Sequence, residues 1–346
     1  MKIARPIERI FDAAMEGKVP SRQECLLLLG FPDTSPEAAI LRATADAVSR
    51  KRFGNQGILQ AQIGLETSSC PGGCGFCVFG EGHSVGARRS LSDEEILLKA
   101  QEATADGDLK TLFLMTMHTF DLERFLEIVC KVKTVIPSHT QIIANVGDFD
   151  LSQAQMMKAS GIAGAYHVCR LREGIDNKLD PAVRKKTLGA IREAGMDLYF
   201  CVEPIGPEHS NEELMDQMAI GFEYGCTQHA AMRRVAVPGT PLCGRGQITE
   251  LRQALVVAVV TLASLGCPVV KNIGVHEPNL LGLTAGANAI SAETGANPRD
   301  TEVDTAGNRG RNCSSGRVML WEAGFTSLQR GDGTTIPLSF PGPPDK

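Results

Sequence analysis

The sequence predicts an α/β fold, and within that class a (β/α)8 barrel of the TIM type. Eight apolar segments rich in β-forming residues recur along the 346 residues, and segments with helical periodicity or helix-capping residues separate them. Eight alternating units are the number that closes a parallel barrel. An open doubly wound sheet is the alternative, but no G-x-G-x-x-G motif follows the first strand. The expected strands are 57–67, 111–117, 141–147, 163–170, 197–205, 229–238, 267–275 and 287–293.

Helix signals lie between these strands. The stretch "SLSDEEILLKAQEA" (90–103) opens with Ser and Asp ahead of apolar residues at helical spacing. Glycines that suit the end of a helix follow several such stretches, at Gly161, Gly195, Gly225 and Gly266. We expect an N-terminal helical extension over 1–56, the barrel over 57–293, and a C-terminal closing segment and tail over 294–346. In the last of these, the polar, Gly-rich stretch 295–312 is expected to cross the barrel as a loop.

Composition limits the function classes. The net charge of −5 argues against a nucleic-acid partner held by a basic field. No run of 18 apolar residues predicts a membrane span, and the first twenty residues lack the apolar stretch of a signal peptide. Eleven cysteines, an odd number, argue against a disulfide framework. A cytoplasmic location is therefore expected, with most cysteines acting as small buried apolar residues.

Three cysteines form a motif that indicates chemistry. Cys70, Cys74 and Cys77 are spaced C-x3-C-x2-C, with glycines between and beside them, directly after the first expected strand. In a barrel this loop lies at the carboxyl-terminal mouth, where barrel enzymes place their active sites. Three thiolates do not complete a tetrahedral zinc site, although His83 is a candidate for a fourth ligand. The favoured interpretation is a 4Fe–4S cluster with one iron left open.

With the aromatic Phe76 before its last cysteine, this motif resembles that of the radical S-adenosylmethionine (SAM) superfamily. Further stretches between about residue 50 and residue 295 resemble one branch, which includes biotin synthase, the iron-only hydrogenase maturase and 3-methylornithine synthase. They are 51–55, 88–97, 172–195, 238–242 and 284–290. The resemblance implies that the open iron binds the amino and carboxylate groups of S-adenosyl-L-methionine. One electron then cleaves the cofactor, and the 5′-deoxyadenosyl radical abstracts a hydrogen atom from the substrate.

The resemblance also implies roles for individual residues. Glu173 matches the acidic residue that contacts S-adenosylmethionine, and Arg184 matches the arginine that pairs with its carboxylate. A solvated helix charge is the alternative for Arg184. Thr116 stands where the family often carries a Gly-Glu pair, and with backbone carbonyls it would hold the ammonium group. The residues expected to lie against the adenine are Phe76, Val78, Ile205 and Gly206.

Polar residues at the strand ends are the candidates for contacting the substrate. They are His118, Asn145, Arg170, Glu203, Arg234, Lys271, Asn272 and Ser291. The three chosen as catalytic candidates are Glu203, Lys271 and His118. Lys271 lies in an apolar run and is expected to meet a carboxylate, from Glu203 or from the substrate, although an internal ion pair is the alternative. His118 is either a proton donor or a satisfied polar residue. The several positive candidates predict a small substrate that carries a carboxylate.

Two reaction classes in cofactor or amino-acid biosynthesis fit this branch: sulfur insertion of the biotin or lipoyl type, and carbon–carbon rearrangement of the methylornithine or hydrogenase-cofactor type. The expected second and third strands lack the cysteines of biotin synthase's auxiliary cluster. Cys313, Ser314 and Ser315 leave a second iron–sulfur cluster open, but a helix capped by serine is favoured there. The expected electron donor is a reductant such as ferredoxin or flavodoxin. A non-catalytic iron–sulfur or zinc-binding barrel is the alternative function.

Overall fold

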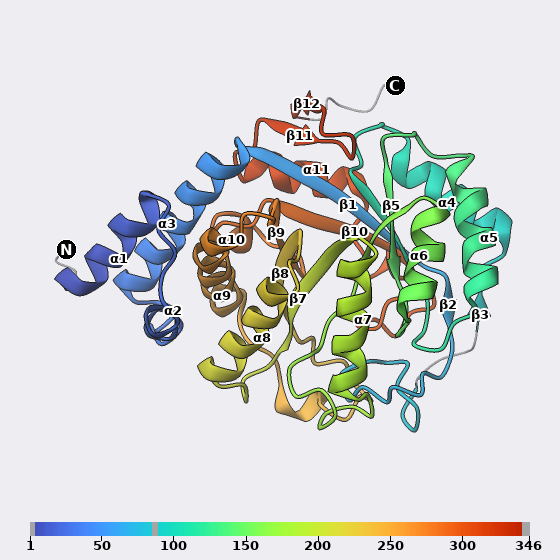
Figure 1. Cartoon of the computed structure of the whole chain (residues 1–346), viewed down its shortest axis with the longest axis horizontal. Coiled ribbons are helices and arrows are strands. Elements are labelled where there is room, and N and C mark those ends of the chain that lie inside the picture. Colours follow the sequence, from blue (N-terminus) through green and yellow to red (C-terminus); the bar gives the residue numbers. More distant parts are fainter. Residues whose placement is uncertain (1–3, 85–88, 341–346) are drawn as a thin grey trace.

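Eight parallel strands close into a barrel in the computed structural model, which describes residues 4–84 and 89–340 (Figure 1). Each strand pairs with the next in chain order, and the last strand pairs back onto β1, with Ile58 opposite Ala289. The barrel strands are β1 (Gln56–Gly64), β4 (Thr111–Met115), β5 (Gln141–Asn145), β6 (Ile162–Tyr166), β7 (Asp197–Ile205), β8 (Gln228–Arg233), β9 (Asn272–His276) and β10 (Ala289–Gly295). This arrangement confirms the predicted (β/α)8 fold.

The seventh barrel strand starts later than the sequence predicts. The apolar run from residue 267 forms a turn, in which the Val270 N–H donates to the Cys267 carbonyl at 3.1 Å. The strand itself begins at Asn272. Pro268 has no N–H to offer a sheet, so an apolar run that contains it favours a turn over a central strand. Lys271 consequently lies before the strand, at the amino-terminal end of the barrel.

Helices cover the outside of the barrel (Figure 1). They are α4 (Asp93–Thr104), α5 (Leu122–Lys133), α6 (Leu151–Ala159), α7 (Pro181–Glu193), α8 (Asn211–Glu223), α9 (Glu250–Ala263) and the short α10 (Leu280–Leu283). Capping boxes start α4, α6 and α8, in which a Ser or Asp side chain and the Glu or Gln three residues later each accept a backbone N–H. These local signals explain why the expected helix starts were readable from sequence.

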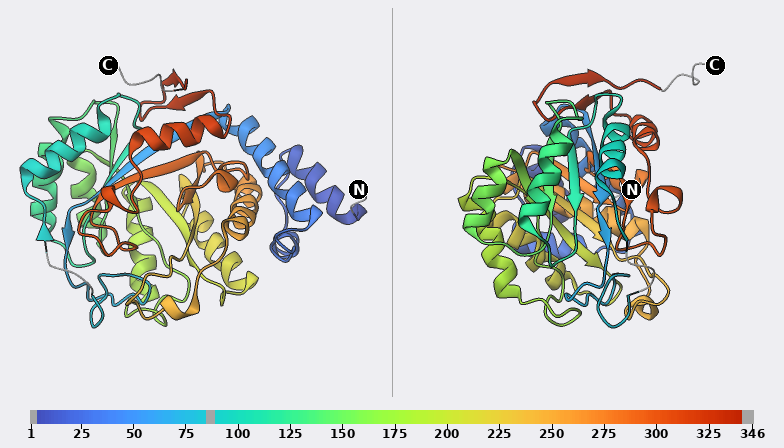
Figure 2. Two further views of the ribbon diagram at one scale, coloured as in Figure 1. Left: turned by 180° about the vertical axis from the view of Figure 1, so that it is seen from behind. Right: turned by 90° about the vertical axis from the view of Figure 1, so that its right-hand side faces the viewer.

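Three helices precede the barrel and pack on its side next to α9 (Figures 1 and 2). They are α1 (Arg5–Met15), α2 (Arg22–Leu29) and α3 (Pro36–Phe53). The sequence of α9, "ELRQALVVAVVTLA", is apolar on all sides, and every residue from Gln253 to Ala263 is buried. A helix of this kind needs cover on both faces, and here the barrel covers one face while α3 contacts the other.

The chain after β10 crosses the carboxyl-terminal mouth of the barrel. The Ala296 N–H donates to the Gly64 carbonyl at 3.1 Å, and the Pro298 carbonyl accepts from Val78 at 3.0 Å. Helix α11 (Cys313–Glu322) then leads to β11 (Ser327–Gln329), which pairs with the start of β1, and to β12 (Thr335–Pro337). A small ladder of β2 (Glu66–Thr67) and β3 (Arg89–Ser90) flanks the cysteine loop. Parts of the expected terminal segments (1–3 and 341–346) and Arg88 of the stretch 88–97 lie outside the described residues.

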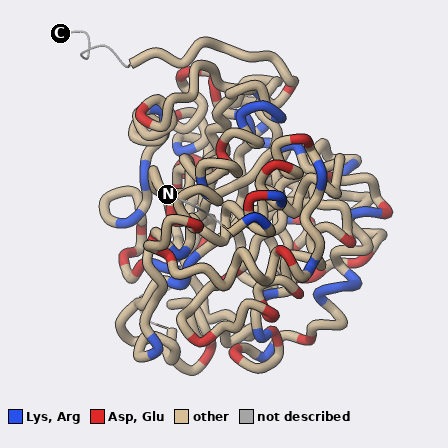
Figure 3. The backbone as a smooth tube through the Cα atoms, turned by 90° about the vertical axis from the view of Figure 1, so that its left-hand side faces the viewer, with Lys and Arg blue, Asp and Glu red and all other residues tan. Residues whose placement is uncertain are grey.

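Basic and acidic residues are interspersed on the side drawn in Figure 3. None of the helices in the described part of the chain combines the length and the apolar character that a membrane crossing requires.

Candidate active site

A cavity opens at the carboxyl-terminal mouth of the barrel and encloses about 1170 Å³ of empty space, counting its open entrance. Its walls bring together the cysteine loop, the ends of the barrel strands and the segment after β10. Cys70, Cys74 and Cys77 all line it, as do His118 and Glu203. The structure thus gathers the predicted metal ligands and two of the three predicted catalytic residues around one space, at the end of the barrel where such sites occur.

Backbone hydrogen bonds hold the cysteine loop to three neighbouring loops. The Gly75 N–H donates to the Asp176 carbonyl after β6, at 2.9 Å, and the Leu242 N–H after β8 donates to the Gly75 carbonyl, also at 2.9 Å. Val78, directly after the third cysteine, donates to Pro298 in the C-terminal segment. The loop is therefore fixed from several sides of the barrel.

The spacing of the three sulfur atoms separates a cluster from a single metal ion. Among the described residues, two groups of three Cys, His, Asp or Glu side chains have ligand atoms that all lie within 4.8 Å of one another, and the three cysteines are not one of them. A tetrahedral zinc ion with Zn–S bonds of 2.3 Å would hold its sulfur ligands about 3.8 Å apart. His83, the candidate fourth ligand, has its Nε2 2.9 Å from the Cys77 carbonyl and does not line the cavity. The sulfurs suit an object larger than one ion.

The environment of the thiols also fits an iron–sulfur cluster. Burial raises the pKa of the Cys74 thiol to about 11, and burial likewise raises the pKa of the Cys77 thiol. Such thiols ionise when a metal replaces the proton. The Phe79 N–H points to the Cys77 Sγ at 3.4 Å, and hydrogen bonds of this kind tune clusters. The donor set therefore fits a 4Fe–4S cluster held by three cysteines.

Arg170 lies between the cysteine loop and the barrel interior. Its guanidinium lines the cavity, sits 5.9 Å from the centre of the Phe76 ring, and has its Nε 3.0 Å from Oε1 of Glu203. That contact is an ion pair that is not aligned as a hydrogen bond, so the buried Nε has no hydrogen-bond acceptor. Arg170 therefore keeps donors available for a carboxylate in the cavity.

Glu173 and Arg184 are engaged with the protein itself. The Glu173 carboxylate accepts from the Arg170 N–H and from Nδ2 of Asn177, both at 2.6 Å, and it does not line the cavity. Arg184 lies at the cavity wall but donates twice to the Val168 carbonyl, at 3.0 and 2.8 Å. Only 4% of the Arg184 side chain is exposed, so it is not the solvated helix charge that was the alternative.

A chain of charged and polar groups continues from Arg184 to His118. Asp148 accepts from Nη1 of Arg184 at 2.9 Å, and its second carboxylate oxygen lies 3.7 Å from Nε2 of His118. The fully buried His167 places its Nε2 3.1 Å from Oδ1 of the same carboxylate. Burial lowers the pKa of His118 and lowers the pKa of His167 to about 3, so both imidazoles are neutral near pH 7. His118 thus faces the cavity with an oriented ring.

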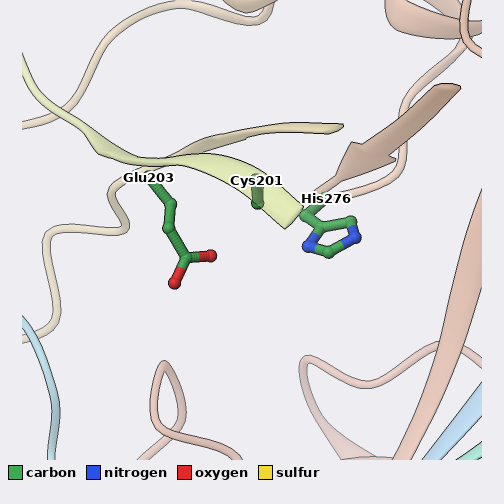
Figure 4. A group of neighbouring side chains, drawn as sticks. All are labelled: Cys201, Glu203 and His276. Carbon is green, nitrogen blue, oxygen red and sulfur yellow. The ribbon is translucent and has the colours of Figure 1, made fainter. Parts of the chain in front are cut away.

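The interior end of the cavity holds a second polar group around Glu203 (Figure 4). Tyr166 donates its hydroxyl to Oε2 of Glu203, and the Tyr166 ring stacks on His276 with 5.6 Å between ring centres. The ligand atoms of Cys201, Glu203 and His276 all lie within 4.8 Å of one another. Because Tyr166 and Arg170 already contact both oxygens of Glu203, this group is better suited to a polar substrate than to a metal ion.

Arg299, in the segment after β10, is a cavity residue that the sequence did not identify. Its Nε pairs with Glu277 at 2.7 Å and its Nη2 pairs with Glu293 at 2.6 Å. The sequence predicted only that this polar segment crosses the barrel, because no local periodicity marks which of its residues turns inward. The pattern "NPRD" gives no signal of a buried arginine.

Of the other predicted cofactor contacts, two line the cavity and three do not. Phe76 and Thr116 line the cavity, and the Thr116 hydroxyl donates to the Met117 carbonyl at 3.0 Å. Val78 is fully buried in an apolar cluster beside the cysteine loop. Ile205 and Gly206, at the end of β7, are buried and do not line the cavity.

Some of the predicted substrate contacts line the cavity and others lie outside it. Asn145, Arg170 and Ser291 line the cavity together with His118 and Glu203. Arg234 is buried in a pair with Glu208, outside the cavity.

Two strand-end predictions are wrong because the seventh strand starts late. The Lys271 side chain is exposed, and its Nζ lies 3.9 Å from Asp197 rather than near Glu203. Asn272, the first residue of β9, likewise belongs to the amino-terminal half of the barrel.

The region of Cys313 lies away from the cavity. Cys313 is the first residue of α11, and its Sγ contacts the Ala103 carbonyl of α4 at 3.4 Å. Asn312 caps this helix by accepting the Ser315 N–H at 2.8 Å, so a capped helix start is correct but the capping residue is not the expected serine. Of the eleven cysteines, all free, only the three of the motif line the cavity.

Comparisons with known structures agree with this architecture. Methylornithine synthase superposes with a TM-score of 0.78 at 18% sequence identity, covering 93% of this chain and 98% of that protein. The FeFe-hydrogenase maturase HydG from Carboxydothermus hydrogenoformans gives 0.75 at 18% identity, covering 93% and 79%. At these identities the structural likeness establishes the fold.

Sequence relatives lead to the same branch. Biotin synthase from Sulfurihydrogenibium sp. (strain YO3AOP1) is 21% identical over 264 residues, which are 74% of this chain and 78% of the relative. Biotin synthase from Xanthomonas euvesicatoria pv. vesicatoria (strain 85-10) is 24% identical over 300 residues, which are 82% and 85%. The profile of the Radical SAM superfamily matches residues 66–220, which contain all three cysteines of the motif. The chain therefore contains a Radical SAM superfamily domain over residues 66–220.

Proposed function

We propose that this radical SAM enzyme cleaves S-adenosylmethionine reductively at a 4Fe–4S cluster held by Cys70, Cys74 and Cys77, and that it abstracts a hydrogen atom from a small molecule in the same cavity. One observation carries the proposal. Three half-buried cysteines, whose ligand atoms do not all lie within 4.8 Å of one another, line the same cavity as the polar group around Glu203. Cofactor and substrate therefore have adjacent places within one enclosed space.

When bound, the cluster supplies one electron to S-adenosylmethionine and the resulting 5′-deoxyadenosyl radical takes hydrogen from the substrate. The protein itself binds and orients the cofactor and the substrate, and it excludes water. Phe76 offers an apolar ring, and Arg170 offers the free guanidinium donors that a carboxylate requires. We propose that Arg170 binds the cofactor carboxylate, in place of Arg184, for which the sequence suggested this role.

Glu173 and Arg184 then act as positioning residues. Glu173 accepts the backbone N–H of Arg170, and Arg184 orients Asp148, which in turn faces His118. Thr116 lines the cavity and keeps oxygen lone pairs for an ammonium group, as first expected. Val78 supports the adenine site from behind, because it packs with the cavity-lining residues Phe79 and Met115. Ile205 and Gly206 stay proposed adenine contacts from the resemblance alone.

The substrate lies on the interior side, against Tyr166, Glu203 and His276. Glu203 is held by a tyrosine hydroxyl and an arginine, so its carboxyl group is fixed in place to orient a polar substrate. His118 and His276 are neutral and able to accept a proton. We propose His118 and Glu203 as the groups that handle protons or hydrogen bonds at the substrate.

Carbon–carbon rearrangement is the reaction class that the cavity favours over sulfur insertion. Sulfur insertion needs an accessible sulfur donor close to the substrate, and within the described residues no cysteine beyond the three of the motif lines the cavity. Cys201 has its Sγ within 4.8 Å of the ligand atoms of Glu203 and His276, but it is fully buried behind the cavity wall. A single cluster gives about four irons per chain, and a count clearly above that supports insertion. A cytoplasmic reductant of the ferredoxin or flavodoxin type would deliver the electron.

The test is reductive cleavage without substrate. The anaerobically reconstituted protein, incubated with dithionite and S-adenosylmethionine, is expected to form 5′-deoxyadenosine, and Cys74→Ala is expected to abolish it. Cys130→Ala is the matched control, because Cys130 is exposed on α5, outside the cavity. Equal 5′-deoxyadenosine formation by Cys74→Ala, or none by the wild type, would favour the alternative of a non-catalytic metal-binding barrel.

A further inference from the structure

A second chamber lies beside the main cavity and shares a wall with it. It encloses about 600 Å³ of empty space, including its opening, between the ends of β8, β9 and β10 and the C-terminal segment. Glu277, Pro278, Ser291 and Glu293 line both spaces. The two spaces are therefore direct neighbours at the level of Ser291.

Three arginines from two separate parts of the chain line this chamber. Arg233 lies at the end of β8, and Arg309 and Arg311 lie in the segment after β10. The Arg233 Nη2 donates to Glu250 at 3.1 Å, and the Arg309 Nη2 donates to Glu277. The guanidinium groups of Arg233 and Arg309 each have five N–H donors and use one of them. The Arg311 side chain pairs with none of the described residues.

The unused donors include buried ones. The Nε atoms of Arg233 and Arg309 are both buried without a hydrogen-bond acceptor. A buried donor without an acceptor is unfavourable, and it is uncommon in folded proteins unless a ligand or water completes the site. Two such atoms on two arginines at one chamber indicate that an acceptor belongs there.

The acidic residues of the chamber do not accept from these two Nε atoms, and their oxygens are mostly engaged elsewhere. Glu277 uses one oxygen for Arg299 and the other for Arg309. Glu293 uses one oxygen for Arg299, at 2.6 Å, and the other for Asn297, at 2.8 Å. Only Glu250, half-exposed at the start of α9, keeps a free oxygen. The hydrogen-bonding capacity that remains in the chamber is thus mostly that of donors.

We infer that the second chamber binds an oxyanion, a carboxylate or a phosphate, at the end of the substrate remote from the carbon that loses hydrogen. Arginine suits either group, because two of its N–H donors match two oxygens of one anion. The inference rests on the proposed function only in treating the occupant of the main cavity as the substrate. It narrows the substrate to an elongated small molecule with an anionic end.

The test measures anion binding without catalysis. Isothermal titration of the full, anaerobically reconstituted chain with inorganic phosphate and, separately, with succinate is expected to show binding of at least one above a sodium chloride reference. The double variant Arg233→Gln/Arg311→Gln is expected to weaken that binding about tenfold or more. Glu250→Gln, which removes a competing negative charge, is expected to strengthen it. Arg192→Gln, an arginine on the outer helix α7, is the control of equal charge change.

The two anions separate the two sources of the oxyanion. Binding of phosphate alone identifies a phosphate-bearing substrate, and binding of succinate alone identifies a carboxylate. The inference is overturned if neither anion binds, or if the double variant binds like the wild type. Arg311→Gln alone, at an exposed position, gives the same comparison if the double variant does not fold.

The same protein samples distinguish this inference from the proposed function. Formation of 5′-deoxyadenosine without substrate is expected to be unchanged in Arg233→Gln/Arg311→Gln. If the wild type binds an anion but forms no 5′-deoxyadenosine, the proposed function is overturned and the inference of an anion site in the second chamber stands. If the wild type forms 5′-deoxyadenosine but binds neither anion, only the inference of an anion site is overturned.

Discussion

Arg184 donates to the carbonyl oxygen of Val168 from both Nε and Nη2, at 3.0 and 2.8 Å. The same guanidinium reaches Asp148 with Nη1, so one side chain connects the end of β6 to the acid that faces His118. Lysine has one ammonium group and cannot reproduce this planar arrangement of donors. The charge of Arg184 alone therefore does not explain its place in the structure.

Arg184→Lys is expected to lower the free energy of unfolding by about 2 kcal/mol, because charge-assisted hydrogen bonds to the Val168 carbonyl are lost at a buried position. Urea denaturation followed by circular dichroism measures it. Arg192→Lys, on the same helix but facing outward, is the control. Equal denaturation midpoints for wild type and Arg184→Lys would contradict the structural role.

Arg170→Gln is expected to weaken S-adenosylmethionine binding by about 10- to 100-fold while iron and sulfide content stay at the wild-type value, because one charged hydrogen-bonding group is removed and the cysteines are not. Equilibrium binding to the reconstituted protein measures the change. Arg245→Gln, an arginine outside the cavity, is the control. Unchanged affinity in Arg170→Gln would exclude a contact between Arg170 and the cofactor.

Glu203→Gln is expected to destabilise the protein by about 1.5–3 kcal/mol, because it removes the carboxylate that pairs with the half-buried Arg170 guanidinium. Tyr166→Phe, which removes only the hydroxyl donated to Glu203, is expected to cost about 1 kcal/mol. Chemical denaturation of the single variants and of Glu203→Gln/Arg170→Gln forms a double-mutant cycle. Additive effects in that cycle would show that the two side chains are not coupled.

Gly147→Ala is expected to destabilise the protein by about 1–3 kcal/mol or more and to displace His118. A Cβ at Gly147 would lie 1.7 Å from the His118 carbonyl oxygen, a backbone atom that cannot move aside alone. Gly189→Ala in α7 is the matched control, because a Cβ there meets nothing within 4 Å and alanine favours a helix. Thermal unfolding should show a lower midpoint for Gly147→Ala and a higher midpoint for Gly189→Ala than for the wild type. A higher midpoint for Gly147→Ala would refute the close approach.

The stability of the protein is expected to fall as the pH drops below about 6.5. Burial lowers the pKa of His167 to about 3, against about 6.5 in the unfolded chain. Between these values the unfolded state binds one proton more than the folded state, so the free energy of unfolding decreases by about 1.4 kcal/mol per pH unit. His167→Gln should reduce the slope by about this amount, leaving the share of the other buried histidines such as His229, when denaturation is compared at pH 6.5, 5.5 and 4.5. Parallel pH profiles for the two proteins would show that His167 does not stay neutral.

The sequence was sufficient to predict the fold and the general position of the site. Alternating strands and helices follow from local apolar patterns, and parallel strands bring their carboxyl ends to one mouth, so Glu203, Asn145 and Ser291 were found from strand ends alone. The cysteine motif needed no structural information. The position of Lys271 does not follow from the apolar pattern, because the first residues of that run form a turn around Pro268 and not a strand.

The remaining features depend on contacts between distant parts of the chain. Arg299 meets Glu277 and Glu293 only because the segment after β10 returns across the mouth. The preference for Arg170 over Arg184 at the cofactor depends on which guanidinium has free donors, and that depends on the Val168 carbonyl. No periodicity in the sequence records such pairings, because they are set by tertiary packing.

The crossing segment after β10 also determines when the site is complete during synthesis. Cys70, Cys74 and Cys77 leave the ribosome more than 200 residues before Pro298 and Arg299. Until those two residues arrive, the cysteine loop lacks one of its backbone anchors and the cavity lacks a wall. A nascent chain therefore exposes its three thiols to oxygen and to stray metals, so delivery of the cluster is best matched to the finished, released polypeptide.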